Sequence, residues 1–260
     1  MNILDKIIAY KKKEIESISS ITPIDKIKEG HRLFQIRDFK NALMGNSIKV
    51  IAEIKRCSPS EKDIMIDAKP SLVAKDYEKN GASAISVLTD KHFFGGDLDF
   101  IQQVKSAIGL PVLRKDFIIS EYQVWESFYA GADAILLIAD TLDFEELKNL
   151  YDLSYKLGMH VLVEFHSFDS LVDMEKLSPE IIGFNCRDLK SMKTDIRLFE
   201  KVYKGLPDCS LKVAESGISN HDDLGKIFKL GYNAALIGTS LMKSGQPGYA
   251  LSSILNKVYK

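Results

Sequence analysis

The sequence predicts an α/β fold, a (β/α)8 TIM barrel with an N-terminal helical extension, and three observations lead to it. From residue 49 onward, eight short apolar runs alternate with amphipathic helical stretches. The runs are continuously apolar, as in Ala-Ile-Leu-Leu-Ile at 134–138, which is typical of parallel strands covered on both faces. Glycines that would cap the preceding helices stand just before four of the runs: Gly81, Gly131, Gly158 and Gly231.

Two helical stretches precede the predicted barrel. Apolar residues recur at helical spacing between Ile3 and Ile18 on an otherwise charged segment, and a second short stretch covers residues 39–44. The triplet Lys11-Lys12-Lys13 is interpreted as a solvated helix face. So short a segment holds too few apolar residues for its own core. We therefore expect residues 1–47 to form an extension packed on the barrel and residues 48–260 to form the barrel, as a single structural domain.

The predicted strands cover residues 49–54, 84–88, 111–113, 133–138, 160–163, 181–184, 211–214 and 234–237. Eight strand–helix units of this length suit a closed barrel of near-minimal size. An open, doubly wound sheet is the alternative, and it usually carries a glycine-rich dinucleotide turn after its first strand. Here Ser58-Pro59-Ser60 stands at that turn, and the sequence contains no GxGxxG motif.

Composition excludes several classes of function. The net charge of −1 gives no reason to expect a nucleic-acid or membrane partner. The three cysteines lack paired spacing, and the five histidines are scattered singly, so neither a disulfide framework nor a metal site is expected. The sequence has neither a signal-peptide pattern nor an apolar run of membrane-spanning length, and we expect a cytoplasmic protein.

Polar residues gather where the predicted strands end. The carboxyl ends of barrel strands and the loops after them form the active site in this fold. A single charged strand end is ordinarily a solvated terminus, but grouped buried charges are costly unless they serve a function. Carboxylates facing lysines indicate acid–base chemistry at a carbonyl. The residues concerned are Glu53, Lys55, Lys115, Asp116, Glu164, Asn185, Arg187 and Glu215.

The last two strands predict a phosphate site. Glu215-Ser216-Gly217-Ile218 and Gly238-Thr239-Ser240-Leu241 combine small residues, hydroxyls and free backbone N–H groups. The alternative is that these are only turn residues and N-caps. Phe93, Phe94 and Phe117 are either lid or core aromatics or the wall of a ring pocket. His166 follows the fifth predicted strand and could reach the mouth, but it is interpreted as a solvated loop histidine.

The chain resembles the indole-3-glycerol phosphate synthase family over essentially its whole length. Seven stretches carry the resemblance in order: Ile51 to Ser60, Ser86 to Asp90, Leu113 to Phe117, Val163-Glu164, Gly183 to Leu189, Ala214 to Ile218 and Leu236 to Met242. After Ser58-Pro59-Ser60 the family usually has a small or basic residue and then glycine, whereas Glu61-Lys62-Asp63 follows here. We expect this departure to affect the first loop and not the chemistry.

The resemblance implies cyclisation of 1-(2-carboxyphenylamino)-1-deoxyribulose 5-phosphate, with loss of CO2 and water and without a cofactor. It implies Lys115 as general acid on the ketone oxygen, Glu164 as acid/base partner in dehydration, and Lys55 as the group that holds the substrate carboxylate. Which lysine delivers the proton in dehydration stays open. It further implies orienting roles for Glu53, Asn185, Arg187 and Glu215, phosphate contacts from Ser58, Ser216, Gly217, Gly238, Thr239 and Ser240, and a ring pocket of Pro59, Phe94, Phe117, Leu136 and Leu189.

Two other functions stay open at this point. Another phosphosugar barrel enzyme, such as phosphoribosylanthranilate isomerase, would leave Lys55 and Lys115 without a task. A non-catalytic barrel that binds a phosphorylated ligand would be expected to lose Lys115 or Glu164 while it kept the phosphate loops, and both residues are present. The expected partner is a small phosphorylated substrate, and association with other tryptophan-pathway enzymes stays open.

Overall fold

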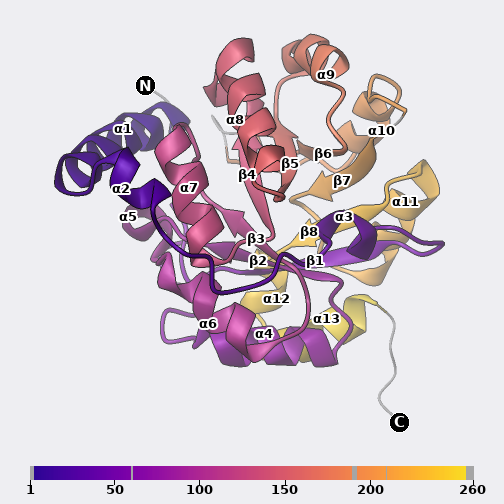
Figure 1. Cartoon of the computed structure of the whole chain (residues 1–260). Coiled ribbons are helices and arrows are strands. Elements are labelled where there is room, and N and C mark those ends of the chain that lie inside the picture. The colour runs from indigo at the N-terminus through magenta and orange to yellow at the C-terminus, as the bar shows by residue number, and fades with distance from the viewer. Residues whose placement is uncertain (1–2, 60, 189–191, 209, 256–260) are drawn as a thin grey trace.

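The chain forms a closed barrel of parallel strands surrounded by helices (Figure 1). The computed structural model describes residues 3–59, 61–188, 192–208 and 210–255. Within them each strand pairs with its neighbour in sequence, and β1 pairs with β8 to close the barrel. The predicted (β/α)8 barrel is thus confirmed. The strands are β1 (Lys49–Ile54), β2 (Ala84–Leu88), β3 (Val112–Lys115), β4 (Ala134–Ile138), β5 (His160–Phe165), β6 (Ile181–Asn185), β7 (Leu211–Glu215) and β8 (Ala234–Ile237).

Four strands extend further toward their carboxyl ends than the apolar pattern predicts. Pairing of Leu88 with Lys115 and of Ile138 with Glu164 keeps these charged residues inside β3 and β5. Asn185 and Glu215 pair with each other at the ends of β6 and β7. The apolar signal stops earlier because the side chains become polar at the mouth, although the backbone ladder continues.

The helices begin and end at residues that the sequence makes recognisable. Gly131 and Gly231 are left-handed C-caps, with φ of 98° and 102°, a conformation that costs glycine nothing. Asp143 begins α8 with a reciprocal capping box to Glu146. The helices after β1 are α4 (Pro70–Lys79), α5 (Lys91–Phe94), α6 (Asp99–Ala107), α7 (Glu121–Ala130), α8 (Phe144–Lys156), α9 (Leu171–Leu177), α10 (Leu198–Tyr203), α11 (His221–Leu230), α12 (Thr239–Met242) and α13 (Pro247–Ile254), with 3-10 turns η1 (Ala139–Thr141) and η2 (Phe168–Ser170).

Two hydrophobic cores follow from the alternation of side chains along each strand. One lies between the strands and the surrounding helices. The other fills the barrel interior, where inward-facing residues such as Ile51, Leu113 and Leu162 are fully buried. Because the apolar interior residues lie toward the amino ends of the strands, the polar inward residues are left at the opposite, carboxyl end.

The N-terminal extension spans the barrel from one end to the other. It contains α1 (Ile3–Ile21), α2 (Ile24–Lys28) and α3 (Phe39–Ala42), of which α2 lies against α7. Phe39 and Leu43 are buried and belong to the interior core, so α3 closes the amino-terminal end of the barrel. The α1 helix begins at the other end, where Ile7 reaches the mouth.

A buried aspartate joins this extension to the barrel. Asp133, just before β4, accepts hydrogen bonds from the backbone N–H groups of Arg37 and Val112, both at 2.7 Å. Lys105 Nζ contacts both of its carboxylate oxygens, at 2.7 and 2.8 Å. Both side chains are fully buried, and the carboxylate is satisfied from every side, as a buried charge must be.

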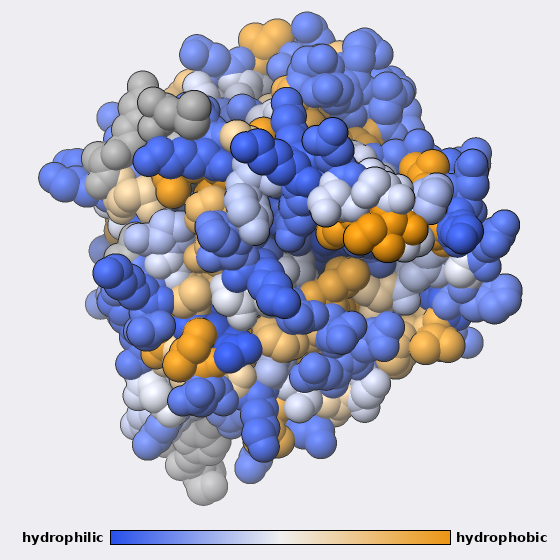
Figure 2. Space-filling model, turned by 90° about the vertical axis from the view of Figure 1, so that its left-hand side faces the viewer, coloured by the Kyte–Doolittle hydropathy of each residue, from blue (hydrophilic) through white to orange (hydrophobic). Residues whose placement is uncertain are grey.

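The surface is mainly hydrophilic. On the face shown in Figure 2, hydrophobic residues form small separate patches among hydrophilic ones. In the part of the chain that the structure describes, no helix is both long and apolar enough to cross a membrane.

Candidate active site

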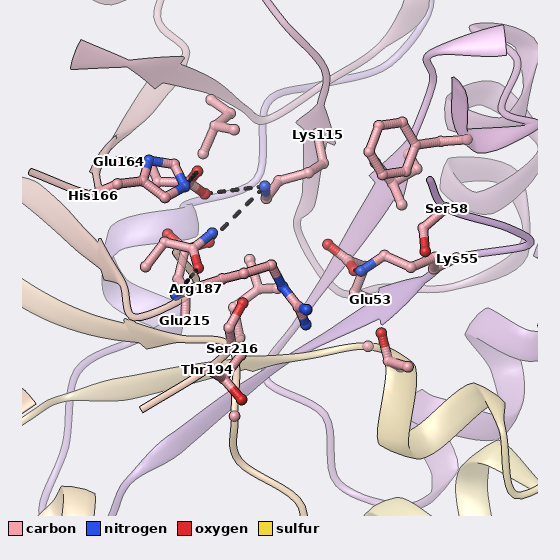
Figure 3. A pocket seen from close by; sticks show the side chains of 18 of the residues that line it. Glu53, Lys55, Ser58, Lys115, Glu164, His166, Arg187, Thr194, Glu215 and Ser216 are labelled. Atoms are coloured by element: carbon pink, nitrogen blue, oxygen red, sulfur yellow. Dashed lines mark hydrogen bonds and ion pairs between the residues drawn. The ribbon is translucent and has the colours of Figure 1, made fainter. Parts of the chain in front are cut away.

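A cavity of about 470 Å³ opens at the carboxyl ends of the strands (Figure 3). It brings together residues from all eight strands and the loops after them. Leu189, predicted to wall the ring pocket, lies outside the described residues. The other predicted site residues all line the cavity: Glu53, Lys55, Ser58, Pro59, Phe94, Lys115, Phe117, Leu136, Glu164, Asn185, Arg187, Glu215, Ser216, Gly217, Gly238, Thr239 and Ser240.

Lys115 occupies the centre of the site, between two carboxyl groups. Its Nζ lies 3.0 Å from Glu164 Oε2 and 4.0 Å from Glu215 Oε2 (Figure 3). Burial alone would lower the pKa of Lys115, but the negative charges of Glu164, Glu215 and Glu53 raise it above the ordinary value. The lysine is therefore an ammonium ion at neutral pH, a form that can donate a proton or a strong hydrogen bond.

Glu164 and Glu215 are both buried, but their environments drive their pKa values apart. For Glu164, burial raises the pKa, while Lys115 and then His166 outweigh that effect and bring it below the ordinary value. For Glu215, burial and the neighbouring charge of Glu164 raise the pKa well above the ordinary value. The two carboxyl groups that face the same lysine therefore differ in how readily they ionise, and Glu164 is the more readily ionised. Paired carboxyl groups in different protonation states are a common basis of acid–base catalysis.

Glu53 and Lys55 form a second ion pair, at the end of β1. Lys55 Nζ lies 2.5 Å from Glu53 Oε1, as expected for residues two apart on one strand. Glu53 is buried, while the Lys55 side chain stays partly exposed to the cavity. A Cβ at Gly238 would collide with the Glu53 carboxylate, so glycine at the end of β8 makes room for it.

Gly183 makes room for a carboxyl group in the same way. It lies on β6 beside Glu164 on β5. A Cβ at Gly183 would overlap Glu215 Oε1 and stand 3.2 Å from Leu162 Cδ1. The bare backbone at this position is what allows the Glu215 side chain to enter the barrel interior.

The loops after β7 and β8 form one wall of the cavity. Ser216 and Gly217 are consecutive residues in the left-handed region, with φ of 73° and 75°. Ser240 Oγ donates a hydrogen bond of 3.2 Å to the Ile218 carbonyl and so joins the two loops. Together with Thr239, this wall presents hydroxyls and closely approachable backbone.

Apolar residues form another part of the cavity wall. The rings of Phe94 and Phe117 lie with their centroids 5.9 Å apart. Ile3, Leu4 and Ile7 of α1 also line the cavity, and the sequence signalled only that their helix packs on something. Phe93 is absent from the cavity lining, since its ring packs edge-on against Tyr10, at 5.6 Å between centroids.

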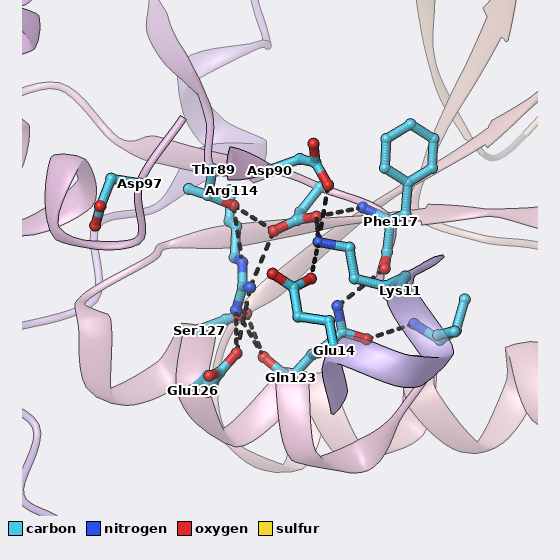
Figure 4. Close-up of polar contacts among 12 residues, drawn as sticks. Lys11, Glu14, Thr89, Asp90, Asp97, Arg114, Phe117, Gln123, Glu126 and Ser127 are labelled. Atoms are coloured by element: carbon cyan, nitrogen blue, oxygen red, sulfur yellow. Dashed lines mark hydrogen bonds and ion pairs between the residues drawn. The ribbon is translucent and has the colours of Figure 1, made fainter. Parts of the chain in front are cut away.

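The predicted solvent-exposed position of Lys11 is wrong. Its side chain is 4% exposed, and its Nζ lies 2.9 Å from Asp90 Oδ2 and 3.2 Å from Asp116 Oδ1 (Figure 4). Lys11 stands one helical turn after Ile7 and thus continues the buried face of α1, a signal that the sequence does carry.

Asp116 therefore serves a purpose different from that of its neighbour Lys115. Its carboxylate accepts hydrogen bonds from Thr89 Oγ1 at 2.6 Å and from Arg114 Nη2 at 3.0 Å. Burial alone would raise the pKa of Asp116, but Arg114 and then Lys11 lower it to about 2. The group is a structural anion whose charge is fully compensated.

His166 is a site residue for which the sequence interpretation favoured the wrong one of two alternatives. It lines the cavity, and its side chain is only 12% exposed. Its Nε2 lies 3.4 Å from Glu164 Oε1, so it is not a solvated loop histidine. Its position two residues after Glu164 was the one available signal, because that spacing directs both side chains to the same side.

The departure in the first loop has a structural counterpart. Ser58 and Glu61 exchange backbone hydrogen bonds of 2.8 and 3.1 Å across a tight turn. Glu61 Oε1 also lies 2.6 Å from Lys243 Nζ, beyond α12. The glutamate thus connects the loop after β1 to the segment after α12.

An ammonium ion held between carboxyl groups at the carboxyl mouth of a (β/α)8 barrel defines an enzyme of the acid–base class. A family model described as indole-3-glycerol phosphate synthase matches residues 4–253. The chain belongs to the indole-3-glycerol phosphate synthase family. It is accordingly a lyase of tryptophan biosynthesis, and the family match favours this function over the isomerase and the non-catalytic barrel.

Curated relatives agree with the family match over almost the full length. The indole-3-glycerol phosphate synthase of Caldanaerobacter subterraneus subsp. tengcongensis is 42% identical over 241 residues, covering 93% of each chain. That of Shouchella clausii is 40% identical over 258 residues, covering 98% of each. Among solved structures, 3-hexulose-6-phosphate synthase from Salmonella typhimurium aligns with a TM-score of 0.63 at 14% identity, over 81% of this chain and 100% of that one. At that identity the likeness concerns the fold alone.

Proposed function

We propose that the protein cyclises 1-(2-carboxyphenylamino)-1-deoxyribulose 5-phosphate to indole-3-glycerol phosphate, with Lys115 as the general acid. The observation that carries the proposal is the Lys115 ammonium held between Glu164 and Glu215 inside the cavity. As the aromatic carbon attacks the ketone, the ketone oxygen takes a proton from Lys115 and becomes a hydroxyl. Loss of CO2 then restores the aromatic ring.

Dehydration completes the indole, and we assign its proton transfers to Glu164. The Glu164 carboxylate removes a proton from the substrate as the new hydroxyl departs as water. Either Lys55 or Lys115 supplies the proton that the leaving oxygen needs. Glu164 suits a base because it is ionised and 2% exposed, so water competes little for it. Glu53, Asn185 and Glu215 orient the two lysines and the substrate.

Anchors at both ends of the substrate would press its two parts together. Lys55 would hold the substrate carboxylate, and Arg187 would help to orient the substrate. Pro59, Phe94, Phe117 and Leu136 would enclose its ring. Ser58, Ser216, Gly217, Gly238, Thr239 and Ser240 would hold the phosphate. Holding a flexible molecule in a reactive geometry contributes several kcal/mol by itself, on the order of 7–11 kcal/mol in the best cases.

Replacement of Lys115 by alanine tests the assignment of the general acid. We expect turnover to fall by about 10² to 10⁴, the usual contribution of a positioned acid or base. Product formation is followed by the absorbance or fluorescence of the new indole, without added metal or cofactor. Lys148→Ala is the control, since Lys148 is 48% exposed and pairs with Asp152 on the surface of α8. Wild-type turnover in Lys115→Ala would disprove the assignment.

Replacement of Ser216 or Thr239 by leucine tests the phosphate end. Hydrogen bonds to a charged group contribute roughly 1.5–3 kcal/mol each, so inhibition by inorganic phosphate should weaken by at least about tenfold. KM should rise in parallel, while kcat at saturation changes less. Unchanged inhibition by phosphate in both variants would move the phosphate site to another part of the cavity.

A further inference from the structure

His166 lies between two carboxylates at the end of β5. Its Nε2 is 3.4 Å from Glu164 Oε1, and its Nδ1 is 3.3 Å from Asp140 Oδ2. Figure 3 shows the ring beside Glu164, on the side away from Lys55. The imidazole thus connects the loop after β4 to the proposed base, and none of the steps proposed above uses it.

Asp140 is itself held rigidly, so it can orient the ring. Oδ2 accepts a hydrogen bond of 2.7 Å from the backbone N–H of His166, and Oδ1 accepts one of 3.0 Å from Ser170 Oγ. The backbone N–H of Ser167 donates to the same carboxylate at 3.2 Å. A carboxylate bound on both oxygens fixes the direction in which the His166 ring points.

The two oxygens of Glu164 face two different nitrogen-bearing side chains. Lys115 Nζ contacts Oε2 at 3.0 Å, and the His166 ring faces Oε1. An imidazole ring donates from both nitrogens only when it is protonated, and here both nitrogens face carboxylate oxygens. Glu215 has Lys115 at 4.0 Å and no histidine beside it among the described residues. The charged and titratable groups around Glu164 are Glu53, Lys55, Lys115, Asp140, His166, Arg187 and Glu215.

We propose that His166, oriented by Asp140, is a positioning residue for Glu164 that favours ionisation of this carboxyl group over that of Glu215. Without the ring, Lys115 would be left to distinguish the two carboxyl groups, and a proton taken up by the pair would spend more time on Glu164. A protonated Glu164 cannot take the proton that dehydration releases. The inference rests on the proposed role of Glu164 as the base.

The test is a titration of the Glu164 carboxyl carbon by NMR, in protein labelled with carbon-13 at the glutamate side-chain carboxyl. The Glu164 signal is assigned by its loss in Glu164→Gln. In His166→Gln its titration midpoint should rise by about one pH unit, because an opposite charge within about 4–6 Å has an effect of that size. The acid limb of the pH profile of kcat should move up by the same amount, because turnover requires the ionised form of Glu164, and KM should stay unchanged.

His160→Gln is the matched control. His160 begins the same strand that His166 follows, it is similarly buried, and its Nε2 lies 3.3 Å from Asp38 Oδ1 at the opposite end of the barrel. A purely structural effect of losing a histidine–carboxylate pair would appear in both variants. We expect the Glu164 midpoint and kcat to stay unchanged in His160→Gln.

Asp140→Asn keeps the inference testable if His166→Gln does not fold. Asparagine retains an oxygen for the backbone N–H groups but removes the charge that orients the ring. It should move the Glu164 midpoint in the same direction by a smaller amount. An unmoved midpoint in the folded variants, or an equal shift in His160→Gln, would overturn the inference. Wild-type turnover in Glu164→Gln would instead overturn the proposed base, so the two failures can be told apart.

Discussion

At the scale of single residues, the site depends on where side chains are missing as much as on where they are present. Gly183 leaves the space that the Glu215 carboxyl group occupies, and Gly238 does the same for Glu53. Both glycines lie at the carboxyl end of the barrel, where charged side chains must fit inside a ring of strands. A buried carboxyl group needs this room to approach its lysine.

We expect Gly183→Ala to lower kcat by about 10²-fold, because a displacement of about 1 Å in a catalytic group has an effect of that order. The added Cβ would push the Glu215 carboxyl group away from Lys115. Gly225→Ala is the control, since a Cβ at this position on α11 meets no atom within 4 Å. Steady-state kinetics of the two variants provide the measurement. Equal kcat values would show that the position of Glu215 is unimportant.

At the scale of elements, a buried ion cluster fixes α1 to the carboxyl ends of β2 and β3. Two residues of α1 join this cluster (Figure 4). Lys11 contacts Asp90 and Asp116, and Glu14 Oε2 lies 2.6 Å from the Lys11 Nζ. Arg114 enters the cluster from β3 and also contacts Glu126 of α7 at 3.3 Å. The same strand ends in Lys115, so the docking of α1 and the catalytic lysine share one support.

Replacing Lys11 by methionine should cost about 3–5 kcal/mol of unfolding free energy, since two carboxylates would lose a buried partner. Asp116 has a pKa of about 2 in the folded state, below its unfolded value. Its stabilising contribution is therefore present above the unfolded pKa and is lost as the pH falls toward 2. In Lys11→Met that pKa should rise, so acid unfolding should occur at higher pH.

The neighbouring Lys12→Met is the control for this experiment, since Lys12 is exposed on the same helix. Circular dichroism during acid titration and denaturant unfolding measures both effects. If the two methionine variants unfold at the same pH and with the same free energy, the cluster does not support the docking of α1.

At the scale of the whole molecule, the extension and the barrel share both the cavity and the interior core. Ile7 lines the mouth, while Phe39 is fully buried at the other end. We expect residues 1–47 to unfold together with the barrel in a single transition, because their side chains belong to both the cavity wall and the interior core.

Alanine at each of these two positions should separate stability from activity. Phe39→Ala should cost about 3–5 kcal/mol and Ile7→Ala about 2–5 kcal/mol of unfolding free energy. KM should rise only in Ile7→Ala, because only that side chain lines the cavity. Denaturant unfolding and steady-state kinetics on both variants give the comparison, and a raised KM in Phe39→Ala would contradict it.

The barrel and most of its candidate site could be predicted from the sequence alone. Continuous apolar runs and helix-ending glycines are local signals, and parallel strands around a closed barrel place all their carboxyl ends at one mouth. Knowing which residues end the strands was therefore enough to gather Glu53, Lys115, Glu164 and Glu215 around one cavity. The family resemblance rested on the same strand ends.

Only the tertiary structure decided which way several side chains point and what the extension covers. Lys115 and Asp116 are adjacent, yet one faces the cavity and the other a buried ion cluster. Lys11 is buried, and His166 pairs with Glu164. Each of these outcomes depends on contacts between segments far apart in the chain. Local periodicity carries no information about such contacts, because they are set by how the elements pack.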